Sequence, residues 1–309
     1  MKLPPHLIYP SAVFAESFHR HAAEGAARMA TAKIAFVGLA RDCGPRLVDN
    51  LKRLEQMVSG CLGWSLHIEA NDCSDNTEAV LAEFCGKHDQ ASYRYRTLGR
   101  QSRSSEFAGP RTIALAEYRT ACQDVVRNMA DEPDYVVMVD WDQWGGWSPA
   151  GFANGIGWLV ELQGAYGMAS VSLSQHPMLF LTDKENAEMR PAWTHYDAWT
   201  LRINSFWDDY TAGEGGWKHQ WIPPVGSDPI RVCSAFGGLA IYRTEDYLQG
   251  VYDGRTDCEH VKLDESIQKA TGKHLYLNPS MRCVMGWITE DDNARHGQHG
   301  VQDAAGGAA

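Results

Sequence analysis

Tyr135-Val-Val-Met-Val-Asp-Trp-Asp142 is the stretch of sequence that decides the fold. Its run of β-forming apolar residues predicts a strand buried on both faces, as in a parallel sheet. The strand ends in Asp140 and Asp142, whose side chains point to the same side if the extended conformation persists. Two carboxylates this close repel each other unless a cation lies between them or their pKa values separate. The pair predicts a divalent-cation site, with a solvated acidic loop as the alternative.

Upstream of this stretch, strand patterns alternate with helix patterns. The sequence predicts strands at 33–40, 64–70 and 93–98 and helices at 11–30, 47–57, 78–86 and 111–129. Polar residues follow two of these strands, at Arg41 and at 71–76, as Asp140 and Asp142 follow the strand from 135. Ligands bind at the carboxyl ends of strands in such sheets. The pattern therefore predicts an α/β fold with helices on both faces of the sheet and one polar edge.

The second half of the chain is less regular. Residues 234–242 predict a glycine-kinked strand, 259–271 predict a helix that stops at Gly272, and 275–277 predict a strand. The stretch 193–221 is rich in Trp, Tyr and Gly. No internal repeat or linker is evident.

Composition excludes several function classes. The 309 residues include 39 acidic and 28 basic side chains, which gives a formal net charge of −11. This balance argues against a nucleic-acid partner and against electrostatic docking on an anionic membrane surface. An acidic protein still binds a phosphorylated small molecule when a divalent cation bridges the charges.

The cysteines and the N-terminus bear on localisation. Eight cysteines without a CxxC pair predict free thiols in a reducing compartment. No apolar run reaches the length of a membrane span, and two prolines interrupt the first ten residues where a signal peptide needs an apolar stretch. We expect a cytoplasmic protein, with peripheral association at the inner face of the membrane left open.

Several single residues are candidates for the site. Asp72 suits a contact to a nucleobase, although 71–77 also reads as a turn with helix-capping residues. Arg41, Arg111 and Arg119 suit phosphate or base contacts, with surface ion pairs as the alternative. Glu259 and His260, with Asp264 and Glu265, form a second acidic cluster at a predicted helix start, where a general base would fit, with a charged helix face as the alternative. His296 is a late metal-ligand candidate or a solvated histidine.

The order of these motifs resembles a GT-A glycosyltransferase. The segments Tyr196-Asp-Ala-Trp199, 229–242 and 258–279 make the chain similar to fungal capsule-associated mannosyltransferases (family 69-like) and their bacterial relatives. The resemblance spans roughly residues 33 to 285. It implies a Rossmann-like nucleotide-binding half, a mixed and mostly parallel central sheet, and sugar transfer from a nucleotide-diphosphate donor with Mn²⁺ or Mg²⁺.

Roles for individual residues follow from the resemblance. Asp140 would face the ribose and the metal, Asp142 would ligate the metal, and Asp72 would read the base. Gly237 and Gly238 would let a sugar approach the backbone, and Glu259 would lie near the reacting sugar. The nucleotide-sugar contacts expected in all are Arg41, Glu69, Asp72, Arg111, Asp140, Trp141, Gly237 and Gly238. On the acceptor side we expect Trp199, Trp207, Trp217 and Trp221, with core packing as the alternative. The fungal pattern has Ser-Glu-Cys at 258–260, where this chain has Cys-Glu-His, so the base and the stereochemistry stay open.

The expected organisation is an N-terminal helical extension at 1–30, one GT-A domain at 31–295 and a flexible tail at 296–309. Within the domain, 31–147 would bind the nucleotide sugar, a GDP- or UDP-sugar, and 148–295 would bind a carbohydrate or other hydroxyl acceptor. Polysaccharide or glycoconjugate synthesis is the expected setting. An inactive GT-A scaffold or carbohydrate-binding protein is one alternative. A sugar nucleotidyltransferase is another, although residues 38–44 hold too few glycines for its phosphate loop.

Overall fold

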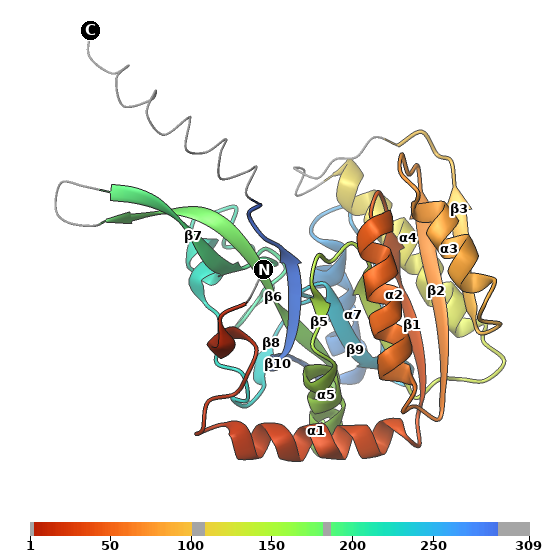
Figure 1. The fold of residues 1–309 in the computed structure, drawn as a ribbon, viewed down its shortest axis with the longest axis horizontal. Coiled ribbons are helices and arrows are strands. Elements are labelled where there is room, and N and C mark those ends of the chain that lie inside the picture. The colour runs from red at the N-terminus through yellow and green to blue at the C-terminus, as the bar shows by residue number, and fades with distance from the viewer. Residues whose placement is uncertain (1–2, 101–108, 182–186, 290–309) are drawn as a thin grey trace, which may run out of the picture.

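The computed structural model describes residues 3–100, 109–181 and 187–289, and one mixed sheet runs through this part of the chain (Figure 1). The strand order is β3-β2-β1-β4-β9-β6-β10-β5, with β7 paired to β6 and β8 paired to β10. The strands are β1 (Lys33–Ala40), β2 (Gly63–Asn71), β3 (Ala91–Arg96), β4 (Tyr135–Asp140), β5 (Gly146–Trp147), β6 (Ala165–Leu181), β7 (Ala187–His195), β8 (Ile230–Val232), β9 (Leu239–Arg243) and β10 (His274–Gly286).

Helices cover both faces of this sheet. They are α1 (Ala15–Met29), α2 (Gly44–Val58), α3 (Thr77–Cys85), α4 (Pro110–Arg127), α5 (Pro149–Glu161), α6 (Thr244–Tyr247) and α7 (Glu259–Thr271), with 3₁₀ turns η1 (Pro5–Leu7) and η2 (Gly215–Gln220). Along β1, Ile34 and Phe36 point into a core shared with α2, α3 and α5. The alternating residues Ala35 and Val37 point into a second core shared with α4 and α7. The predicted α/β fold is confirmed.

The first half of the sheet is parallel. β2 and β4 flank β1, with Leu39 opposite both Glu69 and Asp140, and β3 lies outside β2. The carboxyl ends of β1, β2 and β4 therefore meet at one edge of the sheet. That edge carries the polar residues that follow each strand.

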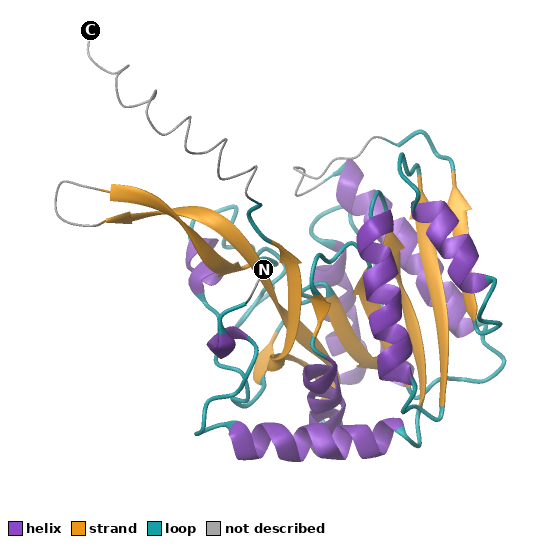
Figure 2. Cartoon of the chain, in the orientation of Figure 1, coloured by secondary structure: helices purple, strands orange, loops and turns teal. Residues whose placement is uncertain are grey.

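The second half is mixed, and its long strands were not predicted. β9 runs antiparallel to β4 and β6, while β10 runs parallel to β6. β6 and β7 form a hairpin that projects from the body of the protein (Figure 2). The strand predicted from 234 begins only at Leu239, because Gly237 and Gly238 take left-handed backbone conformations with φ of +70° and +80°.

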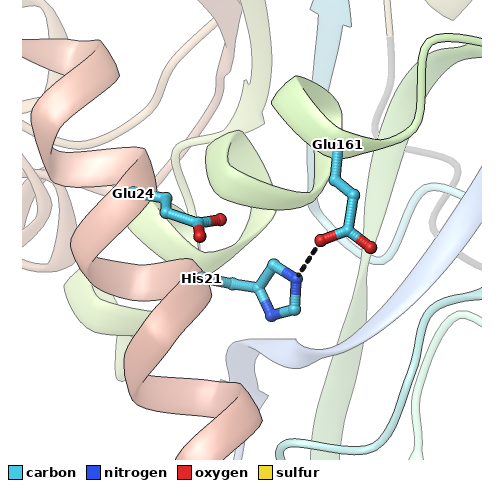
Figure 3. Close-up of side chains that lie close together, drawn as sticks. All are labelled: His21, Glu24 and Glu161. Carbon is cyan, nitrogen blue, oxygen red and sulfur yellow. Dashed lines mark hydrogen bonds and ion pairs between the residues drawn. The ribbon is translucent and has the colours of Figure 1, made fainter.

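α1 packs across α5, and glycines permit the contact. A Cβ at Gly157 would lie 2.0 Å from the carbonyl oxygen of His21, so no larger residue fits there without a shift. The His21 ring stacks on Trp158 at 3.6 Å and its Nε2 lies 3.0 Å from Glu161 (Figure 3). Ligand atoms of His21, Glu24 and Glu161 lie within 4.8 Å of one another, but Arg20 already pairs with both glutamates. This cluster joins two helices.

The described residues contain no helix long and apolar enough to cross a bilayer. The eight cysteines are free thiols. The C-terminal tail, including His296, lies outside the described residues.

Candidate active site

A cleft of about 870 Å³ opens at the carboxyl ends of β1, β2 and β4. The first turns of α4 form one wall, and β-strand ends form the floor. The lining residues are Leu39, Ala40, Arg41, Asp42, Glu69, Asn71, Gly99, Arg100, Pro110, Arg111, Ile113, Ala114, Leu115, Glu117, Tyr118, Arg119, Asp140 and Asp142. The polar clusters after three separate strands therefore contribute to one cleft.

Asp140 and Asp142 stand at one end of this cleft. Backbone pairing of Asp140 N with Gly238 O (2.9 Å) and of Trp141 N with Leu39 O (3.1 Å) fixes the chain between them. The Asp142 side chain reaches solvent, but protein atoms crowd around it and displace part of its hydration. That desolvation, together with the charge of Asp140, raises the pKa of Asp142 to about 6. The two carboxylates thus repel each other.

Trp141, between the two aspartates, faces the opposite way. Its side chain is fully buried in the core and meets Trp147 edge-on at 5.8 Å. Asn50 donates to the Trp141 carbonyl at 3.0 Å and holds the turn. The structure therefore gives Trp141 a packing role, where the sequence predicted a contact to the nucleotide sugar.

Arg119 is the cation buried beside the aspartates. Its Nη2 donates to Oδ1 of Asp140 and its Nε donates to Oε1 of Glu259, both at 3.0 Å. Its guanidinium lies 4.8 Å from the centre of the Phe236 ring. Burial would lower the pKa of Arg119, but Asp140 and Glu259 outweigh it and raise that pKa. Arg119 therefore stays charged and ties α4 to β4 and α7.

The other nucleotide-side candidates divide into cleft residues and structural anchors. Arg41 lines the cleft and donates to the carbonyl of Arg100 at 2.8 Å, and Arg111 lines it from the first turn of α4. Glu69 lies on the floor, 2% exposed, with Arg94 at 2.7 Å and Arg96 at 3.1 Å. Burial would raise the pKa of Glu69, but His67 and Arg94 outweigh it and lower that pKa. Its oxygens are committed to this ion cluster.

Asp72 organises a loop. It adopts a left-handed backbone (φ 47°), and its carboxylate accepts hydrogen bonds from the Asn71 side chain and from the backbone N–H groups of residues 98–100. These bonds lower the pKa of Asp72 to about 2. The carboxylate expected to read a base is thus occupied by the protein itself.

Gly237 and Gly238 are glycines for reasons internal to the protein. A Cβ at Gly237 would lie 2.0 Å from the carbonyl oxygen of Ser170, and one at Gly238 would lie 2.8 Å from Sδ of Met285. The close approach that the sequence predicted for a sugar is made here by neighbouring protein atoms.

The three catalytic candidates lie behind the cleft. Glu259 is 2% exposed at the first turn of α7 and holds Arg119. His260 is buried, with its ring stacked on Phe236 at 3.8 Å, and burial lowers its pKa well below the usual value. Asp264 is fully buried, and burial raises its pKa to about 8. None of these three is among the cleft-lining residues described above.

The four acceptor-side tryptophans are separate from the described lining of the cleft. Trp207 and Trp217 are exposed, at 56% and 49%. Trp221 is half-buried beside Trp217 and packs against the second core, and Trp199 is half-buried. Two of the four tryptophans thus present an exposed aromatic surface, and the other two are partly buried.

Sequence reasoning assigned no role to Tyr196 and Asp197, which follow β7. Tyr196 is 49% exposed, and the protein around it and the charge of Asp142 raise its pKa to about 12. Asp197 accepts a hydrogen bond from Gly237 N at 2.8 Å. The long-range pairing of β7 with β6 brings these residues within range of the charge of Asp140, whereas the sequence marked Tyr196-Asp-Ala-Trp199 only as part of a family resemblance.

The donor set fits a divalent cation. Asp140 is 27% exposed in its side chain and Asp142 is exposed, so both offer carboxylate oxygens toward the cleft. Mg²⁺ and Mn²⁺ favour such oxygen ligands. A cation between them would also relieve the repulsion that raises the pKa of Asp142.

No family model and no curated protein matches the sequence. Solved structures similar to the chain include the mannosyltransferase PcManGT from Pyrobaculum calidifontis in complex with GDP-Man and Mn²⁺, at 12% identity and a TM-score of 0.46, covering 94% of this chain and 73% of that chain. GalNAc-T7 with UDP, GalNAc and Mn²⁺ matches at 9% identity and a TM-score of 0.46, and the match covers 93% of this chain and 55% of that chain. Mannosyl-3-phosphoglycerate synthase from Rubrobacter xylanophilus matches at 10% identity and a TM-score of 0.45, and the match covers 93% of this chain and 80% of that chain. Likenesses this distant carry no argument about function.

Proposed function

We propose that this protein is a metal-dependent glycosyltransferase that moves a sugar from a GDP- or UDP-sugar to a hydroxyl acceptor, such as a carbohydrate. The observation that carries the proposal is the pair of Asp140 and Asp142 at the end of the β4 strand, open to a cleft of about 870 Å³. A strand-end cleft of this size suits a nucleotide sugar.

The charges of the cleft support a diphosphate ligand. Arg41 and Arg111 line it, and α4 begins there with Pro110, so the positive end of the helix dipole faces the same space. The acidic pair alone would repel a diphosphate. Mn²⁺ or Mg²⁺ held by Asp140 and Asp142 would neutralise the charge that develops on the leaving diphosphate.

The residues of the chain have separate tasks in this proposal. Asp140 and Asp142 hold the metal, and Arg119 orients Asp140 through the 3.0 Å hydrogen bond to Oδ1. Arg41 and Arg111 attract the phosphates. Tyr196, which lies within range of the charge of Asp142, would mark the side from which a carbohydrate acceptor approaches, and the exposed Trp207 and Trp217 would extend it, since aromatic faces stack on sugars.

The test is release of nucleoside diphosphate from a panel of UDP- and GDP-sugars with Mn²⁺. We expect release from at least one donor by the wild-type protein and none by Asp142→Asn. The matched control is Asp131→Asn, which changes an aspartate that is 84% exposed and pairs with Lys33 at the opposite end of β1. Release by Asp142→Asn at the wild-type rate would contradict the proposal, and absence of release from every donor would favour an inactive scaffold.

A further inference from the structure

The Asp197 carboxylate and the Asp140 backbone are hydrogen-bonded to adjacent residues of one short segment. Gly237 N donates to Oδ2 of Asp197 at 2.8 Å, and Gly238 O accepts from Asp140 N at 2.9 Å. Both glycines hold left-handed φ values, which fixes the segment in a tight bend. The carboxylate of Asp197 therefore lies near enough to Asp140 for the two charges to interact.

The Asp197 backbone is also held in place. Its N–H donates to Oγ of Ser172 at 3.0 Å, and the preceding Tyr196 N–H donates to the Ser172 carbonyl at 3.0 Å. Ser172 belongs to β6, in the centre of the sheet, so the position is rigid. A carboxylate fixed on a rigid element is well suited to chemistry that depends on distance.

Two other acidic groups near the site, Glu259 and Asp264, are committed to partners in the interior. Glu259 is 2% exposed and holds Arg119, and Asp264 is fully buried and accepts from the Tyr166 hydroxyl at 3.0 Å. Asp197 is only half-buried, and its neighbour Tyr196 is 49% exposed.

We propose that Asp197 is the general base of the transfer reaction and accepts the proton of the acceptor hydroxyl. This assignment rests on the proposed function. In the step, the acceptor oxygen forms a bond to the anomeric carbon while the bond from that carbon to the diphosphate oxygen breaks. The diphosphate leaves with the bonding electron pair, and the hydroxyl proton moves to the Asp197 carboxylate. Such a step inverts the configuration at the anomeric carbon.

Water serves as the acceptor in the test, because hydrolysis of the donor needs the same base. Wild type, Asp197→Asn, Glu259→Gln and the surface control Asp131→Asn are compared with UDP-glucose, GDP-mannose and Mn²⁺. Asparagine keeps a carbonyl oxygen for Gly237 N but accepts no proton. We expect Asp197→Asn to hydrolyse the donor about 10²–10⁴-fold more slowly, with the Kd for the Mn²⁺-nucleotide within about threefold of wild type, because only the transition state uses a base.

A second variant separates chemistry from structure. Formate should restore part of the hydrolysis lost in Asp197→Ala, since a small carboxylate can enter the space and take the proton. Asp197→Asn activity above a tenth of wild type, loss of Mn²⁺-nucleotide affinity in that variant, or absence of formate rescue would each overturn the assignment. If Glu259→Gln alone abolishes hydrolysis, the base is Glu259. A wild-type protein that neither binds nor hydrolyses any donor contradicts the proposed function itself.

Discussion

Arg119 Nη2 lies 3.0 Å from Oδ1 of Asp140, so a buried cation on α4 fixes one oxygen of the carboxylate at the end of β4. The same guanidinium holds Glu259 at the start of α7. Three elements far apart in the sequence thereby meet at one charge. We infer that this contact sets the direction in which Asp140 presents its other oxygen to the cleft.

Arg119→Gln should lower the free energy of unfolding by about 3–5 kcal/mol, because it leaves Glu259 buried without its cation. Chemical denaturation measures the loss. Arg127→Gln is the matched control on the same helix, since Arg127 pairs with Asp124 at the exposed surface. The control should lose no more than about 0.5 kcal/mol. Equal losses in the two variants would show that the buried bridge has no special weight.

Gly237→Ala should destabilise the protein more than Gly272→Ala. Both glycines have a left-handed φ, +70° and +69°, so both substitutions carry a strain of about 1–2 kcal/mol. Only the Cβ at position 237 would also meet Ser170 O, at 2.0 Å, whereas position 272 is open. Thermal and chemical unfolding compare the pair. If Gly237→Ala loses no more stability than Gly272→Ala, the segment around Gly237 moves away from Ser170 without cost in free energy.

Asp264→Asn should stabilise the protein increasingly as the pH rises from 5 to 8. The folded protein holds the Asp264 proton with a pKa of about 8, far above that of an unfolded aspartate. The folded state thus binds a proton that the unfolded state has released, so wild-type stability falls with rising pH in this window. Asparagine has no such proton. The difference between the two unfolding free energies should grow by up to about 1.4 kcal/mol per pH unit. A difference that stays constant with pH would contradict the claim that folded Asp264 keeps its proton.

Several elements of the fold follow closely from local patterns. β1 spans the predicted 33–40, and α7 with its Gly272 stop spans the predicted 259–271. In these elements the apolar periodicity and the capping glycine agree with the final packing. β6 and β7 escaped prediction because long-range pairing holds them, β7 with β6 and β6 also with β9 and β10. Pro177 and Pro191 within them argue locally against strands.

Most of the candidate site was predictable where a strand ends in a polar residue. Asp140, Asp142 and Arg41 follow from that rule, and the structure brings them to one cleft. Asp72 follows β2 and Glu69 lies near the end of that strand, yet backbone N–H groups occupy the oxygens of Asp72 and arginines occupy those of Glu69. Whether a carboxylate stays available for a ligand depends on partners such as Arg94 and Arg119. These partners come from other elements of the fold, so the local sequence does not reveal the pairing.

Calorimetric titration of UDP and GDP into the protein, in Mn²⁺ and again in EDTA, tests the central claim most directly. We predict binding of at least one nucleotide in Mn²⁺, and affinity at least about tenfold weaker in EDTA, since the diphosphate then meets two uncompensated carboxylates. Asp142→Asn should bind weakly in both conditions while its melting temperature is unchanged or higher, because the substitution removes a like-charge neighbour of Asp140. Equal nucleotide affinity with and without the metal would contradict the account.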